Sequence, residues 1–397
     1  MKPWLLWWLL CACAPGVLAQ PDTLLRRAVE AAWERSLERS ATGGQGEVAR
    51  ARETAAESPW AAPPSVELGY RGDPLSSVAG QRETEVGLAW PLLLPGQRAA
   101  RVAVARAGLD SAEAGSRAAK LRVAGAVRET QWQAQAGAAE LLLAEARAAG
   151  VRSLADDVER RVAAGDLARS DSLAIRAERL AAEAEVAGAR QRLDSVRAAW
   201  RLLTGMDAVP EVAEAEARAM ADDHPEIALA VRNVQAAQDR LDLVRAERSD
   251  PPELLLRYRQ EVAASGATSQ NSIGLAMRLP LGTRDRNLPR EAHAQSELDV
   301  ARAEEQRVRA RVHSTFTVAR AAALSAAARL EAEESRVALL RERARLIELS
   351  FRAGETALPE LLRTLAAAAQ AEAAVARQRA GLGLARARTQ QSAGVLP

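Results

Sequence analysis

Two segments of alternating apolar and polar residues, 65–94 and 253–281, interrupt a sequence that otherwise has the features of long helices. Each segment predicts a β-hairpin with one apolar and one polar face, because successive side chains of a strand point to opposite sides. A two-stranded hairpin cannot bury a core of its own. The hairpins therefore need each other, or strands from further copies, to form a stable sheet.

The alternation assigns the large apolar residues to one face of the predicted strands, which would face lipid if the strands cross a membrane. These residues are Val66, Leu68, Tyr70, Val86, Leu88, Trp90, Leu256, Tyr258, Ile273, Leu275 and Met277. The return strand of the first hairpin has Glu83, Glu85 and Gly87 on its other face. The rings of Tyr70, Trp90 and Tyr258 lie near strand ends, a position typical of aromatic residues at a membrane interface.

The two hairpins belong to an internal duplication. The two tyrosines of the sequence, Tyr70 and Tyr258, are 188 positions apart, and Gly87-Leu88-Ala89 recurs almost the same distance later as Gly274-Leu275-Ala276. The Ala-Gly-acidic triplets that end at Asp166 and Glu355 follow the same spacing. A duplication of this kind predicts two structural repeats of the same design.

The positions of proline and glycine predict the boundaries of these repeats. We expect a signal peptide at 1–19, a first repeat at 20–204, a connection at 205–222 and a second repeat at 223–397. The first repeat would hold N-terminal helices broken at 42–44, the hairpin at 65–94 and long helices at 97–163 and 170–203. The second would hold a helix at 223–249, the hairpin at 253–281 and long helices at 290–353 and 359–391. An aspartate before Pro225 would cap the helix at 223–249.

The first 19 residues have the pattern of a secretory signal peptide: a lysine, a short apolar core and small residues before Gln20. Both cysteines of the sequence, Cys11 and Cys13, lie in this segment. Cleavage after Ala19 would leave a mature chain without cysteine, whereas the Leu10-Cys11-Ala12-Cys13 stretch leaves lipidation at Cys13 as the alternative. Both readings predict an exported protein.

The composition favours long rods over a compact domain. Aromatic residues make up 3% of the sequence, charged residues 27%, and the net charge is +2. Such a chain predicts helices that pack closely through small residues, and it lacks the basic stripe of a nucleic-acid-binding protein. The helix at 97–163 alone would span ~100 Å at about 1.5 Å per residue.

The strands and the rods together predict an assembly. Four strands with one apolar face cannot close a barrel in lipid, but three copies would supply twelve strands with apolar residues outward and charged residues inward. The fold class is therefore mainly α with a small β part. Long antiparallel helical hairpins would pack side by side as rods, and four strands per chain would contribute to a trimeric 12-stranded transmembrane β-barrel. The alternative is that the strands are small soluble additions to a helical bundle.

At this point the sequence resembles the TolC-like outer-membrane efflux proteins over essentially the whole mature chain. The resemblance rests on the paired hairpins, the Pro91-Leu92…Gly96-Gln97-Arg98…Arg101 stretch, the glycine turns Gly165-Asp166…Ser170-Asp171-Ser172-Leu173 and Gly354-Glu355…Pro359-Glu360-Leu361-Leu362, and His224-Pro225-Glu226. Leu279-Pro280-Leu281 followed by Asp285-Arg286-Asn287 is similar to the heavy-metal (CzcC-like) branch of the family.

The resemblance implies a homotrimer in outer-membrane lipid. Its long antiparallel helical hairpins would form a periplasmic α-barrel, a helical tunnel crossing the periplasm. The resemblance also implies a periplasmic adaptor (a membrane fusion protein) and an inner-membrane pump of the resistance-nodulation-division type as partners. The adaptor would dock at Gly165, Asp166, Gly354 and Glu355. The constriction at the tip would involve Asp171, Phe351, Thr356, Glu360 and Arg363. Arg363 stands where the family has a second acidic residue, and Thr356 where it has an arginine.

Nothing in the sequence predicts catalysis, a cofactor or a metal centre. The histidines at 224, 293 and 313 do not share the spacing of metal ligands, and no nucleophile turn is present. The favoured function is a passive exit duct for solutes such as metal ions or drugs, driven by the pump. The alternative is an exported structural coiled-coil protein without a pore.

Overall fold

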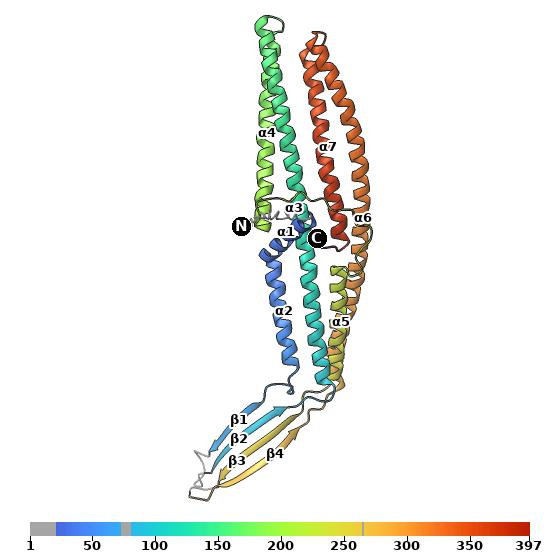
Figure 1. Cartoon of the computed structure of the whole chain (residues 1–397). Helices are drawn as coiled ribbons and strands as arrows, with labels where there is room; N and C mark the ends of the chain where they lie inside the picture. Colours follow the sequence, from blue (N-terminus) through green and yellow to red (C-terminus); the bar gives the residue numbers. More distant parts are fainter. Residues whose placement is uncertain (1–20, 73–80, 264–265) are drawn as a thin grey trace, which may run out of the picture.

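The computed structural model describes residues 21–72, 81–263 and 266–397, and Figure 1 shows a long helical rod with a sheet at one end. The expected signal segment, including Cys11, Cys13 and Ala19, lies outside the described residues. The elements are α1 (Pro21–Arg35), α2 (Leu37–Ala56), β1 (Ser65–Gly72), β2 (Arg82–Pro91), α3 (Gln97–Ala164), α4 (Arg169–Thr204), α5 (Pro225–Ala246), β3 (Glu253–Val262), β4 (Gln270–Arg278), α6 (Arg284–Arg352) and α7 (Leu358–Ser392).

Two helices run most of the length of the molecule. α3 has 68 residues and α6 has 69, which is about 100 Å each at the usual rise per residue. α3 turns back into α4 and α6 turns back into α7, so two antiparallel pairs form the half of the rod farther from the sheet (Figure 1). α2 and α5 lie beside α3 in the half nearer the sheet. Within the described residues, none of the helices has an apolar run long enough to cross a membrane.

Small side chains bring the helices together. Ala118, Ala124 and Ala371 are fully buried on the packed faces of α3 and α7. A methyl group at such a position lets two helix backbones approach more closely than a larger side chain would. Larger apolar residues form separate clusters along the rod, including one around Trp200 and one around Phe351 and Leu361 near the turns.

Three local expectations are wrong. The break expected at 42–44 is absent: α2 continues through it, and the chain bends at Ser36, whose Oγ accepts a hydrogen bond from the Arg39 amide at 3.1 Å. A serine cap fixes a helix start, whereas a glycine pair weakens a helix by only about 1 kcal/mol per residue. Similarly, His224 caps α5 in place of the expected aspartate, through a 3.2 Å bond from the Glu226 amide to Nδ1.

The third correction concerns the start of α6. The sequence predicts helix from residue 290, after Pro289, but α6 begins at Arg284 and contains that proline. A proline near the beginning of a helix is tolerated because it fits helical φ and disturbs only the first turns. Arg286 forms two hydrogen bonds to Asp250, at 2.7 and 2.5 Å, and Asn287 Nδ2 donates to the Arg248 carbonyl at 2.7 Å. These contacts hold the early turns of α6 against the α5–β3 connection.

The four strands form one antiparallel sheet in the order β1-β2-β3-β4. β2 pairs with β3, so the hairpins of the two repeats join edge to edge. The register places Val66, Leu88, Leu256 and Leu275 in one row across the sheet, and Leu68, Val86, Tyr258 and Ile273 in the next such row. The prediction that the apolar residues of all four strands share one face is therefore confirmed.

Candidate functional site

The apolar face of the sheet is exposed to its surroundings. Val66, Leu68, Ile273 and Leu275 are each more than 60% exposed. A monomer in water would not leave so large an apolar surface uncovered, since contiguous patches of this kind mark membrane or protein contacts. β1 and β4 are also edge strands whose backbone groups are open to further pairing.

The opposite face of the sheet carries ion pairs. Glu83 contacts Arg259 at 2.8 Å and Arg71 at 3.8 Å, and Glu85 contacts Arg257 at 3.5 Å. These groups come from β1, β2 and β3, so the charges link strands of both repeats. The alternation in sequence thus produces a sheet with one apolar side and one charged side.

Two glycine turns lie together at the other end of the rod (Figure 1). Gly165 has φ of 88° and Gly354 has φ of 81°, the left-handed region that ends a helix without strain only for glycine. Both glycines therefore end their helices in the left-handed conformation. The amides of Asp166 and Glu355 then bond to the Arg161 and Ser350 carbonyls, at 2.8 and 3.0 Å. Both turns therefore present a short acidic loop at the extreme end of the molecule.

The first turn is fixed by Asp171. Its Oδ2 accepts a hydrogen bond from the Ala168 amide at 3.2 Å, at the start of α4. A carboxylate in this place satisfies a free N–H and interacts favourably with the positive end of the helix. Asp171 is thus bound within its own turn and makes no contact with the second turn among the bonds of the described residues.

The second turn contains Thr356 and Phe351. Thr356 Oγ1 lies 2.6 Å from Ser350 Oγ, which closes the loop from α6 to α7. Phe351 is buried, and its ring is covered by the Arg161 guanidinium of α3 at 5.2 Å from the centroid. This cation–π contact joins the two helical hairpins just below their turns. Arg161 could not be identified from the sequence, because its partner comes from the other repeat.

Glu360 is paired in this structure. Its carboxylate accepts hydrogen bonds from Arg343 Nη2 at 3.0 Å and from Arg363 Nη1 at 2.7 Å. Arg363 was singled out in the sequence, whereas Arg343 was not, because it precedes Glu360 across the α6–α7 turn. The two guanidinium groups reduce the negative charge that Glu360 presents to its surroundings.

A buried polar network at mid-height was also missed from the sequence. Arg128, 2% exposed, binds both Glu214 oxygens and donates to Gln391 Oε1 at 2.6 Å and to the Val395 carbonyl at 3.0 Å. The network ties α3 to the α4–α5 connection and to the C-terminal segment. His224 lies nearby and is buried, and this burial lowers its pKa, against the smaller opposing effects of Glu226 and of the Ser392 carbonyl.

The described residues contain no group of three or more histidine, cysteine, aspartate or glutamate side chains arranged to hold a metal ion. The chemistry of the molecule resides in its surfaces: an apolar and a charged side of the sheet at one end, and acidic turns at the other.

Comparison with protein families gives a match to the model described as outer membrane efflux protein, over residues 44–206. Over these residues, which are fewer than half of the chain, the sequence is similar to the outer membrane efflux proteins. Together with the fold, this match supports an outer membrane efflux channel, a non-enzymatic transporter whose long helical part lies in the periplasm. The alternative of an exported structural coiled coil is set aside. A search of curated protein sequences found no match.

Solved structures establish the fold of this efflux protein over most of its length. CusC has a TM-score of 0.78 at 14% identity, with 94% of this chain and 93% of that chain covered. VceC from Vibrio cholerae has 0.78 at 16% identity, covering 94% and 97%. The open state of MtrE from Neisseria gonorrhoeae has 0.73 at 16% identity, covering 94% and 89%. Channels of this family are trimeric components of efflux systems.

Proposed function

We propose that this efflux protein forms a homotrimer in which three sheets close into a 12-stranded transmembrane β-barrel. The open edges of β1 and β4 and the exposed apolar face are the observations that carry this proposal. In lipid every backbone N–H and C=O needs a partner, so edge strands must meet other edge strands. The shared apolar face then turns to lipid, and the paired charges of the other face line the lumen.

Exposed leucines support the same assembly in the helical part. Leu173 and Leu180 of α4 are 60% and 62% exposed, and Leu339 and Leu346 of α6 are 75% and 52% exposed. Each pair has heptad spacing at a similar distance from its turn. α4 and α6 flank the α3–α7 contact on its two sides, so in a threefold ring α4 of one protomer would meet α6 of the next.

Disulfide cross-linking tests this arrangement in a chain whose two cysteines, Cys11 and Cys13, are first changed to serine. Combining Leu180→Cys with Leu339→Cys should give covalent trimers on oxidation. Each single variant should give none. The purified trimer should also conduct ions passively in a planar bilayer. Monomers without conductance would overturn the proposal.

The two glycine turns are the proposed docking points for a periplasmic adaptor. Gly165, Asp166, Gly354 and Glu355 lie together at the end opposite the sheet, which supports this assignment. An inner-membrane pump of the resistance-nodulation-division type would supply the energy for export, since this protein would serve only as a passive channel. The proposed constriction comprises Asp171, Phe351, Thr356, Glu360 and Arg363.

We propose that the exported solutes are heavy-metal ions. The support is the stretch Asp285-Arg286-Asn287 after the last strand, which is similar to the heavy-metal branch of the family. A host strain lacking this chain should then lose tolerance to divalent transition-metal ions more than to organic dyes. The reverse order of sensitivities would instead support export of organic compounds.

A further inference from the structure

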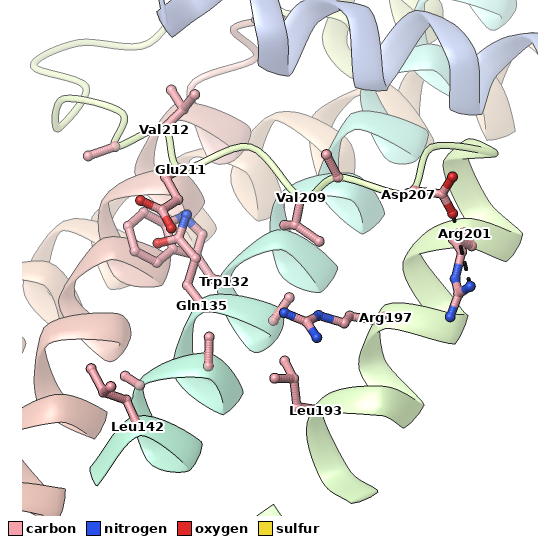
Figure 2. A pocket seen from close by; sticks show the side chains of 15 residues that line it. Trp132, Gln135, Leu142, Leu193, Arg197, Arg201, Asp207, Val209, Glu211 and Val212 are labelled. Atoms are coloured by element: carbon pink, nitrogen blue, oxygen red, sulfur yellow. Dashed lines mark ion pairs between the residues drawn. The ribbon is translucent and has the colours of Figure 1, made fainter. Parts of the chain in front are cut away.

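A cavity of about 790 Å³ lies between α3, α4 and the α4–α5 connection (Figure 2). These elements meet at mid-height of the rod, away from the sheet and from the glycine turns (Figure 1). α3 contributes Trp132 and Leu142, α4 contributes Leu193 and Arg197, and the α4–α5 connection closes the space with Val209 and its neighbours. Most of the lining is alanine, leucine and valine. A concave apolar site with a few polar groups is the usual form of a small-molecule site.

The cavity has a fixed wall. Gln131 Nε2 donates to the Pro210 and Val212 carbonyls, at 3.1 and 2.8 Å, and Gln135 Nε2 donates to the same Pro210 carbonyl at 3.2 Å. These bonds attach the α4–α5 connection to α3, on the side of α3 away from α4. The connection therefore bridges the two helices and keeps the space between them open.

Two hydrogen-bond donors at this cavity have no acceptor among the described residues. Trp132 is 8% exposed, and its indole N–H has no partner among the described residues. Arg197 extends from α4 into the space (Figure 2) and makes no ion pair within the described part of the chain, whereas Arg192 and Arg201 on the same helix pair with Glu140 and Asp207. Glu211, which lines the wall together with the Arg201–Asp207 pair, lies across the cavity from Arg197 (Figure 2).

We propose that this cavity binds a small amphipathic anion, with its acidic group at Arg197 and its hydrocarbon part against Leu142, Leu193 and Val209. An anion oxygen would supply the acceptor that a buried indole N–H requires, and the guanidinium would supply the opposite charge. The apolar walls would remove the hydrocarbon chain from water. This site is separate from the proposed docking turns.

Calorimetric titration of the detergent-solubilised trimer with octanoate and with octylammonium tests the proposal. The two probes have similar hydrocarbon chains and opposite charges. Detergent should therefore take up both to a similar extent, whereas only the anion should bind at Arg197. Octanoate should bind saturably, once per protomer, and octylammonium should not. Loss of one charge-assisted bond in Arg197→Gln should weaken octanoate binding about tenfold.

Two further variants complete the test. Arg169→Gln, on the same helix near the first turn, should bind octanoate as the wild type does. Ala138→Phe should abolish saturable binding, because the ring fills the cavity from an exposed position without replacing a buried side chain. Equal binding of the two probes, an unchanged affinity in Arg197→Gln, or no saturable octanoate binding by the wild type would each overturn the proposal.

Discussion

Trp132 of α3 lies directly over Gly383 of α7. A methyl group at Gly383 would come within 2.1 Å of two indole ring carbons, Cη2 and Cζ3. Such a distance is far inside van der Waals contact. The indole ring of Trp132 therefore fits only because position 383 of the facing helix has no side chain. The contact joins the two repeats where α3 passes α7.

We therefore expect Gly383→Ala to destabilise the molecule by about 1–3 kcal/mol, the usual effect of overpacking a buried contact. The control is Gly381→Ala, two residues earlier on α7, where a methyl group would meet nothing within 4 Å. There alanine should be neutral or stabilising, by up to about 1 kcal/mol. Denaturant unfolding followed by helical circular dichroism measures both. Equal stability of the two variants would show that α7 moves to admit the methyl group.

The facing of the sheet is tested by placing the same charge on either side of one strand. Leu275→Arg would bury a guanidinium against lipid at about 2–4 kcal/mol per site if it lies near the bilayer midplane. Ser272→Arg adds the same side chain to the other face of β4 and should be tolerated. The fraction of protein inserted into the outer membrane is the measurement. Similar insertion of both variants would contradict the assigned faces.

The second turn should tolerate no side chain at its left-handed position. Gly354→Ala forces a methyl group into φ of 81°, which costs about 1–2 kcal/mol for a residue other than glycine. Gly150→Ala, on α3 near the first turn, adds a methyl group in open space and is the control. We expect Gly354→Ala to weaken binding of the adaptor while membrane insertion stays intact. A pull-down with a periplasmic adaptor that the wild-type protein captures tests this, and undiminished capture would show that the turn adapts.

The buried cap of α5 should make stability depend on pH. Burial lowers the pKa of His224 below its usual 6.5. As pH falls through that value, the unfolded chain takes up a proton that the folded chain does not, so stability decreases with acidification and levels off below the folded pKa. His224→Asn keeps a capping oxygen and removes the titrating ring. The loss of melting temperature between about pH 7.5 and about pH 5.5 should be smaller in this variant than in the wild type; an equal loss would assign it to other groups.

Local periodicity explains why the sheet could be predicted. Val86 and Tyr258 belong to different repeats, yet each strand alone shows which of its residues are apolar, and the register has only to align the two faces. The length of α3 follows from the absence of proline and from its turn glycine, whereas proline misplaces the start of α6, which begins before Pro289. These features depend on neighbours along the chain, which the sequence displays.

The contacts between helices could not be predicted in the same way. Arg343 reaches Glu360 because the α6–α7 turn sets which faces of the two helices meet. Arg128 and Glu214 form their buried pair because the connection returns across α3. Nearly every helical face of this chain carries arginine and glutamate, so the sequence offers many equivalent partners for each charge. Only the geometry of turns and connections selects among them.

The pairing of Glu360 changes what its substitution should do to the pore. In a threefold assembly with the tip at the narrow end, three copies of Glu360 would face a confined space, where charge rings select ions by their field. Arg343 and Arg363 offset that charge. We therefore expect a weak cation preference in the wild type, lowered further by Glu360→Gln.

Arg363→Asp should have the larger effect, since it removes a positive charge, adds a negative one and frees one side of Glu360. The variant should shift the reversal potential of single channels in a salt gradient toward strong cation selectivity. Glu342→Gln is the matched control, because Glu342 pairs with Arg345 on the exposed side of α6 and belongs to no turn. If Glu360→Gln and Arg363→Asp both leave the reversal potential at the wild-type value, Glu360 does not line the constriction, and the narrow point of the channel lies elsewhere along the rod.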